Sequence, residues 1–85
     1  MSEEKNNKAY EPPIHWGDYE DIAQALYERF GPEFDESKIY RIRFTDLHKW
    51  VTEIPNFSGN ARESNEGHLE QIQSQWVYEW RENNK

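Results

Sequence analysis

Apolar side chains recur at helical spacing in three separate segments of this chain, and this pattern sets its fold class. In the first segment an apolar residue returns every four positions, and the later segments follow the i, i+3, i+4, i+7 pattern with few exceptions. The three sets are Ile22, Leu26 and Phe30; Leu47, Trp50, Val51 and Ile54; and Leu69, Ile72, Gln73, Trp76 and Trp80. Each pattern is typical of a helix with one buried face. The sequence therefore predicts a mainly α domain of three helices.

Polar residues and glycine mark where these helices should begin and end. Asp18 is a suitable N-cap for the first helix, and Gly31 should end it, because glycine readily adopts the left-handed conformation found there. We expect Thr45 to cap the second helix and Pro55 to stop it. Ser64 is the expected cap of the third helix.

The segment between the first two predicted helices has a different sequence pattern. Residues 32–38 form an acidic loop, and residues 39–44 alternate between apolar and basic side chains. A period of two predicts a short strand, so we expect a short or vestigial β element here. Arg41 and Arg43 would lie on one side of it, where they could pair with neighbouring carboxylates.

The chain has the size of one small domain, with 85 residues, 34% of them hydrophobic and 15% aromatic. A few large side chains must therefore supply most of its core. We expect residues 14–80 to form the domain. Residues 1–13 are polar and are expected to be a disordered extension, and residues 81–85 are expected to fray.

Composition excludes several classes of protein. There is no cysteine, so disulfides, thiolate metal sites and cysteine nucleophiles are absent. No apolar run approaches the roughly 20 residues of a membrane-spanning helix. The 17 acidic residues against 10 basic ones give a net charge of −7, which disfavours nucleic-acid binding. We therefore expect a soluble, cytoplasmic monomer that contacts neither membrane nor nucleic acid.

Catalytic constellations are also missing from the sequence. No serine lies in a recognisable nucleophile motif, and no glycine-rich loop is present to hold a phosphate. The three histidines do not form an i, i+4 pair. His15 reads as a domain-boundary residue, His48 as a structural residue beside an apolar stripe, and His68 as exposed. We expect a protein that is not an enzyme.

Most of the negative charge falls in residues 14–38, which hold seven acidic residues and only Arg29 and Lys38 as basic ones. One interpretation is a solvated surface that only keeps the protein soluble. The other is a docking patch or a weak site for a hard cation, since carboxylate oxygens suit Ca²⁺, Mg²⁺, Mn²⁺ or iron. The residues alone leave both interpretations open.

Four segments, in this order and spacing, carry a family resemblance. They are Trp16-Gly17-Asp18; the run from Ile22 to Glu28; the run from Arg43 to Val51, which reads RFTDLHKWV; and Ser64-Asn65-Glu66 with the apolar positions that follow as far as Trp76. Together they resemble the IscX (YfhJ) family, small acidic proteins of bacterial iron–sulphur cluster assembly. The resemblance spans about residues 14–80.

This resemblance implies a modified winged-helix fold that lacks most of the wing. It also implies binding to the cysteine desulfurase IscS, contacts with other cluster-assembly proteins, and weak binding of iron as Fe²⁺ or Fe³⁺. The implied partner-binding residues are Asp18, Asp21, Glu28, Glu33, Asp35 and Glu36. The implied iron-binding residues are Asp21, Glu28, Asp35 and Glu36.

The chain also departs from the family pattern. Relatives often carry several aspartates after the second helix, whereas residues 54–61 here contain no acid. The segment 35–44 is longer than usual. An adaptor or regulator of cluster assembly is the favoured function, with donation of iron, sensing of iron and inhibition of the desulfurase all open. The alternative is an acidic protein-interaction module or winged-helix domain with no role in iron binding.

Overall fold

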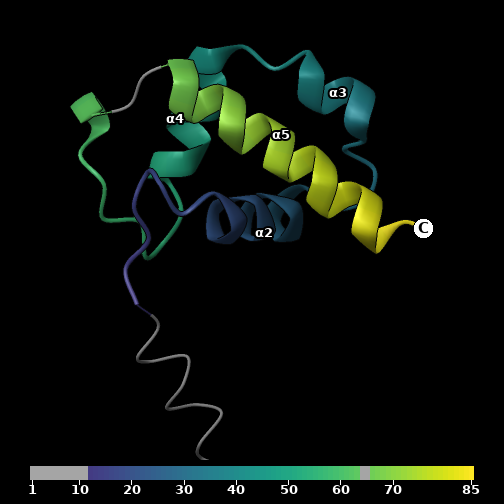
Figure 1. Cartoon of the computed structure of the whole chain (residues 1–85), viewed down its shortest axis with the longest axis horizontal. Coiled ribbons are helices and arrows are strands. Elements are labelled where there is room, and N and C mark those ends of the chain that lie inside the picture. The colour runs from purple at the N-terminus through teal and green to yellow at the C-terminus, as the bar shows by residue number, and fades with distance from the viewer. Residues whose placement is uncertain (1–11, 64–65) are drawn as a thin grey trace, which may run out of the picture.

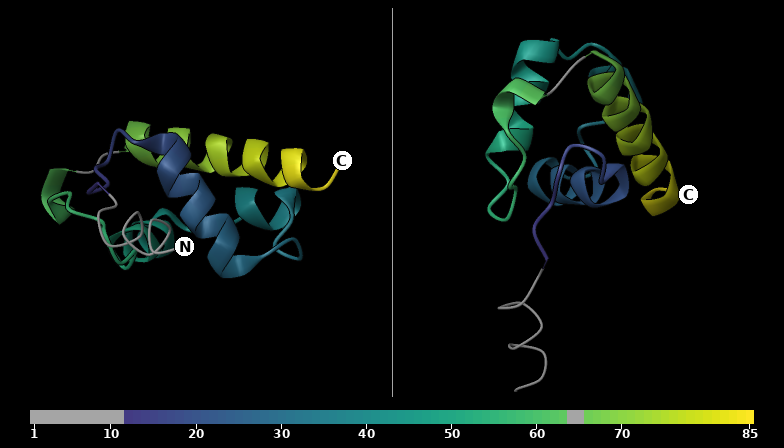
Figure 2. Two further views of the ribbon diagram at one scale, coloured as in Figure 1. Left: turned by 90° about the horizontal axis from the view of Figure 1, so that it is seen from below. Right: turned by 60° about the vertical axis from the view of Figure 1, so that its left-hand side comes forward.

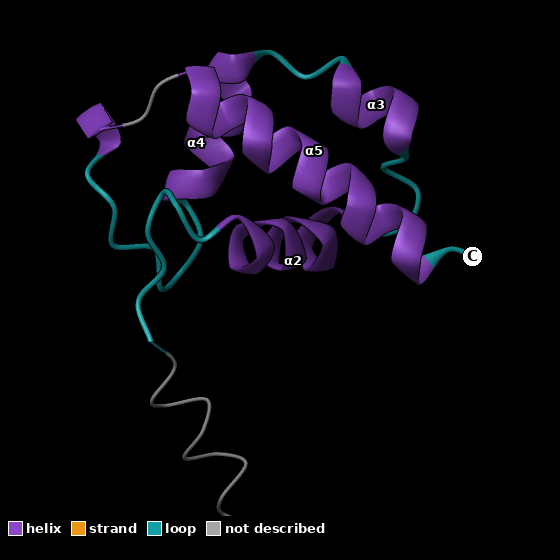
Figure 3. Cartoon of the chain, viewed as in Figure 1, coloured by secondary structure: helices purple, strands orange, loops and turns teal. Residues whose placement is uncertain are grey.

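The chain folds into four α-helices and one short 3₁₀ helix within the residues that the computed structural model describes, 12–63 and 66–85 (Figures 1 and 3). The helices are α2 (Tyr19–Phe30), α3 (Glu36–Tyr40), α4 (Phe44–Thr52), η1 (Ala61–Glu63) and α5 (Glu66–Asn83). The three helices expected from the sequence are α2, α4 and α5, so the mainly α fold class is confirmed. The expected cap at Ser64 and nearly all of the extension 1–13 lie outside the described residues.

Helix α5 is the element against which α2, α3 and α4 all pack. In Figure 1, α3 lies above α5 and α2 lies below it. Figure 2 shows that α2 crosses α5 at an angle rather than running alongside it. Within the described part of the chain, no helix combines the length and apolarity that crossing a membrane requires.

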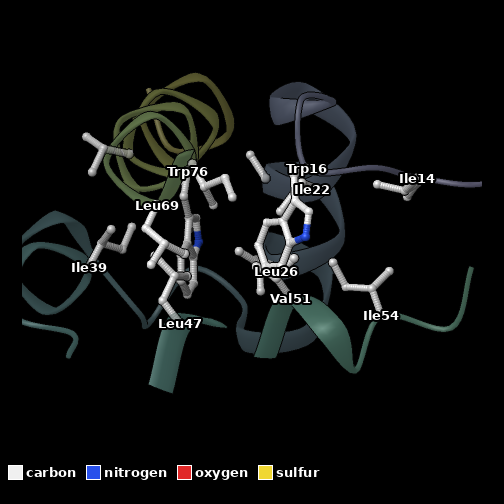
Figure 4. Close-up of a cluster of buried hydrophobic side chains, with 13 residues drawn as sticks. Ile14, Trp16, Ile22, Leu26, Ile39, Leu47, Val51, Ile54, Leu69 and Trp76 are labelled. Carbon is white, nitrogen blue, oxygen red and sulfur yellow. The ribbon is translucent and has the colours of Figure 1, made fainter. Parts of the chain in front are cut away.

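Aromatic rings form the centre of the core. Trp76 of α5 is fully buried, and its ring centroid lies 5.5 Å from that of Phe30, 5.0 Å from that of Phe34 and 6.5 Å from that of Trp50. These rings come from α2, the loop after it and α4. Figure 4 shows buried side chains from these helices and from α3 gathered around Trp76. Large aromatic rings therefore meet at the centre of the core, and buried Ile, Leu and Val side chains complete it.

The strand predicted at residues 39–44 is wrong, because residues 36–40 form helix α3 instead. Asp35 caps this helix, and its carboxylate accepts a hydrogen bond of 3.0 Å from the backbone N–H of Lys38. Ile39 is fully buried, and its carbonyl accepts a 2.9 Å hydrogen bond from Gln73 on α5. The cap from Asp35 and the burial of Ile39 therefore determine the conformation of this segment. The alternation of apolar and basic residues does not determine it.

The expected pairing of Arg41 and Arg43 with neighbouring carboxylates is also wrong. Among the described residues, neither guanidinium is part of an ion pair. Glu36 is paired instead with Arg81, at the far end of α5.

The β pairing found in the described residues is a single parallel bridge between Ile14 and Phe57. The backbone N–H of Ile14 donates to the carbonyl of Asn56 at 2.9 Å, and the N–H of Ser58 donates to the carbonyl of Ile14 at 2.7 Å. This bridge is a vestigial β element, but it lies outside residues 39–44, where it was expected, and joins the start of the domain to the loop after α4.

That loop is held against Trp16. The indole N–H of Trp16 donates to the carbonyl of Asn60 at 2.7 Å, and a Cβ added at Gly59 would lie only 2.8 Å from the Trp16 ring. His48 stacks on Trp16 with ring centroids 5.2 Å apart, so its structural role is confirmed. His68 is half-buried, with its ring parallel to that of Trp16 at 6.4 Å, so the expectation that it is exposed is wrong.

Helix ends agree with the sequence prediction for α2 and differ from it at the start of α4 and the end of α5. Helix α2 ends at Phe30, and Gly31 follows with a φ of 78°, as predicted. Helix α4 begins at Phe44, so Thr45 lies inside the helix and is not its cap. Helix α5 continues to Asn83, past Arg81, where fraying was expected.

We predict that Trp76→Ala destabilises the domain by about 3–5 kcal/mol, since it removes the ring on which three other elements pack. Tyr78→Ala, on the same helix but with 56% of Tyr78 exposed, should change stability by no more than about 0.5 kcal/mol. Urea unfolding followed by circular dichroism measures both. Equal losses for the two variants would contradict the central position of Trp76.

Candidate functional site

The six acidic residues expected to bind a partner divide into two groups. Three of the carboxylates are already engaged in hydrogen bonds or ion pairs: those of Asp18, Asp35 and Glu36. The other three are in no ion pair or hydrogen bond within the described chain: those of Asp21, Glu28 and Glu33. The structure therefore does not present the six as one free patch.

Asp18 stands at the N-cap position of α2, but its side chain makes no cap hydrogen bond to the helix. Its carboxylate instead accepts a 2.8 Å hydrogen bond from the backbone N–H of His15. The position of Asp18 was therefore predicted correctly and its bonding was not. This hydrogen bond fixes the turn that leads into α2.

Asp35 and Glu36 serve to hold α3 in place. Asp35 caps α3, and Glu36 forms a two-pronged ion pair with Arg81 of α5, with N–O distances of 3.0 and 2.7 Å. The hydrogen bond and charge of Glu36 raise the pKa of the Arg81 guanidinium above its ordinary value. Both carboxylates have a structural task, and this reduces what they can offer to a metal or a partner.

The outer face of α2 is different, because its acids are exposed and form no ion pair with the part of the chain that the structure describes. Ile22, Ala23 and Leu26 point into the core, so the helical period turns Asp21 and Glu28 toward the opposite side of α2. Three exposed carboxylates share this outer side, which we call the acidic face: Glu20, Asp21 and Glu28. The sequence interpretation missed Glu20 as a site residue, although Glu20 directly precedes Asp21 in the chain.

A groove runs beside the acidic face, between α2 and the turn that follows α4. Its volume is about 730 Å³. Its lining comes from three parts of the chain: Pro12 and Ile14; Asp21, Gln24, Ala25, Leu26, Glu28 and Arg29; and Glu53, Ile54, Pro55 and Asn56. We call this the α2 groove. The acidic face therefore borders a hollow rather than a flat surface.

One ion pair lies in the α2 groove. Arg29 of α2 and Glu53 at the end of α4 are 2.8 Å apart, and both side chains are 40% exposed or more. Exposed pairs of this kind contribute only about 0–1 kcal/mol, so this one can open at little cost. The sequence alone could not identify Glu53 as a groove residue, because only the fold brings it to α2.

The four residues expected to bind iron are not gathered into one ligand set. Within residues 12–63 and 66–85, no group of three or more His, Asp or Glu side chains is placed to hold a metal ion. Asp21 and Glu28 are seven residues apart, which separates them by about 10.5 Å along the helix axis. Asp35 and Glu36 are engaged elsewhere. The geometry therefore does not fit a chelating metal centre.

Comparison with known proteins finds a matching family and individual relatives. A family model described as iron–sulphur cluster assembly matches residues 14–81. The chain is also 39% identical over 66 residues to an uncharacterised protein of Pseudomonas aeruginosa, a match that covers 78% of this chain and 94% of that protein. Both extend over most of the chain, well beyond the acidic segment.

We predict that Asp35→Ala lowers the free energy of unfolding by about 1 kcal/mol, through loss of the α3 cap. Asp35→Asn should retain most of that stability, because asparagine caps helices as well as aspartate does while lacking the charge. Thermal and urea unfolding of the two variants test this. A loss that is equally large in both would mean that the charge of Asp35 matters and the cap does not.

Proposed function

We propose that this chain, which belongs to the IscX (YfhJ) family of iron–sulphur cluster assembly proteins, binds the cysteine desulfurase IscS through the acidic face of α2. It would act as an adaptor or regulator of cluster assembly and catalyse no reaction itself. The observation that carries this proposal is the group of exposed carboxylates on α2 that no basic side chain in the described chain neutralises: Glu20, Asp21 and Glu28.

A surface of this kind favours a basic partner on physical grounds. Carboxylates gathered on the outer side of one helix give that side a negative potential, and a cationic surface is attracted to it. Opposite charges also steer the two proteins together and raise the association rate. Salt screens such attraction over about 10 Å at 0.1 M, so the complex should weaken as ionic strength rises.

The other expected partner residues take lesser parts in this proposal. Glu33 is exposed and follows the C-terminal end of α2, so it can extend the acidic face. Asp18, Asp35 and Glu36 contribute to the surrounding negative potential, but their carboxylates are held by His15, Lys38 and Arg81 respectively. Direct contacts should therefore concentrate on Asp21 and Glu28.

We propose that this protein binds iron only weakly. Exposed carboxylates are hard ligands that suit iron, and the acidic face offers them without forming a cage. We infer that iron associates loosely with Asp21 and Glu28, in fast exchange, and that Asp35 and Glu36 contribute little. The proposal further includes a cytoplasmic location, a monomeric state and contacts with other cluster-assembly proteins.

We predict that Asp21→Lys combined with Glu28→Lys weakens binding to the desulfurase by about tenfold or more at low salt, because attraction to a basic surface becomes repulsion. Isothermal titration calorimetry at two ionic strengths measures the effect. The wild-type affinity should fall steeply with added salt, and that of the double variant should fall much less.

Glu70→Lys is the matched control for reversing a single charge on the acidic face. Glu70 is exposed on α5 and belongs to no ion pair among the described residues, so its change alters the net charge away from α2. Asp21→Lys alone should weaken binding more than Glu70→Lys does. Unchanged affinity in the double variant, or no binding by the wild type at low salt, would refute the proposal.

We predict that Fe²⁺ added to the ¹⁵N-labelled chain broadens the amide signals near Asp21 and Glu28 before those near Asp35 and Glu36. The reason is that the first pair is exposed and belongs to no ion pair among the described residues, whereas the second is bonded within the fold. Broadening that starts around α3 would contradict this order.

A further inference from the structure

The walls of the α2 groove are tied together by hydrogen bonds on one side and an ion pair on the other. The side-chain amide of Asn56 donates to the carbonyl of Pro12 at 3.0 Å, and the N–H of Ile14 donates to the carbonyl of Asn56 at 2.9 Å. Across the groove, Arg29 joins α2 to Glu53 at 2.8 Å. The groove is therefore formed before any partner arrives, which lowers the entropy lost on binding.

The lining of the groove has two chemical characters. The apolar part of the lining, which we call the floor, includes the edges of two core residues, since Ile14 and Ile54 are each 8% exposed. Ala25 and Pro55 add further apolar surface. Its acidic members come from both walls: Asp21 and Glu28 on α2, and Glu53 after α4.

We propose that the α2 groove receives a segment of the desulfurase in which an apolar side chain is flanked by arginine or lysine. This inference rests on the proposed function and specifies how the partner is recognised. The apolar side chain would cover the floor, and the flanking cations would meet Asp21, Glu28 and Glu53. A purely charged surface would use the acidic face but would leave the floor uncovered.

Arg29 is an internal competitor for such a segment. Its guanidinium already satisfies Glu53, so a cation from the partner must displace it to reach that carboxylate. Removing Arg29 would expose Glu53 without touching the floor of the groove. Removal of the Arg29 side chain should therefore strengthen binding to the desulfurase.

Filling the groove without changing charge is the direct test. In Ala25→Trp a large ring occupies the floor, and Gln24→Trp places the same ring at an exposed lining position where folding is not at risk. Gln71→Trp, at an exposed position on α5, is the matched control. Calorimetric titration against the desulfurase should show a loss of about tenfold for the two groove variants and no change for the control.

The outcomes separate this inference from the proposed function. Full affinity in folded Ala25→Trp and Gln24→Trp, together with weakened binding by Asp21→Lys with Glu28→Lys, would overturn the groove and leave the acidic face in place. Full affinity in all of these variants would overturn both. If Ala25→Trp is unfolded by circular dichroism, Gln24→Trp alone decides the question.

Arg29→Ala should change the affinity for the desulfurase in the opposite direction. It should bind several-fold more tightly than wild type, whereas Arg62→Ala should change affinity little, although both remove one positive charge. Arg62 is exposed on η1 and belongs to no ion pair in the described chain. An equal gain in affinity in the two variants would mean that binding depends on the net charge of the protein alone. That result would contradict a desulfurase segment that engages Glu53.

Discussion

The burial of Trp76 is the interaction on which the rest of this small domain depends. Its ring meets Phe30 of α2, Phe34 of the following loop and Trp50 of α4, so one side chain of α5 holds three other parts of the chain. A chain with few apolar residues gains most of its stability from such large rings. Helix α2 packs on α5 through its inner side, and among the described residues Glu20, Asp21 and Glu28 are exposed on α2.

The acidic residues therefore have different tasks according to where the fold places them. Around α3 they are used inside the molecule, Asp35 as a helix cap and Glu36 as the partner of Arg81. On the outer face of α2, Asp21 and Glu28 have no such partner in the described chain. We attribute the binding of a basic partner to this second group, and the integrity of the fold to the first.

Sequence periodicity predicted α2, α4 and α5, because burial of one face leaves a regular trace in the chain. It failed at residues 39–44, since the cap from Asp35 and the single buried residue Ile39 leave no such trace. The candidate site was only partly predictable for the same reason. Helical spacing places Asp21 and Glu28 together, but Glu36 meets Arg81 from 45 residues away, and only the fold brings Glu53 to α2.

The central claim is that the partner surface is the acidic face of α2 with its groove. Its most direct test is a titration of the ¹⁵N-labelled chain with unlabelled desulfurase, followed by amide chemical shifts and signal loss. The account predicts that the first changes occur from Glu20 to Arg29 and from Glu53 to Asn56. First changes confined to α3 and the exposed side of α5 would contradict it.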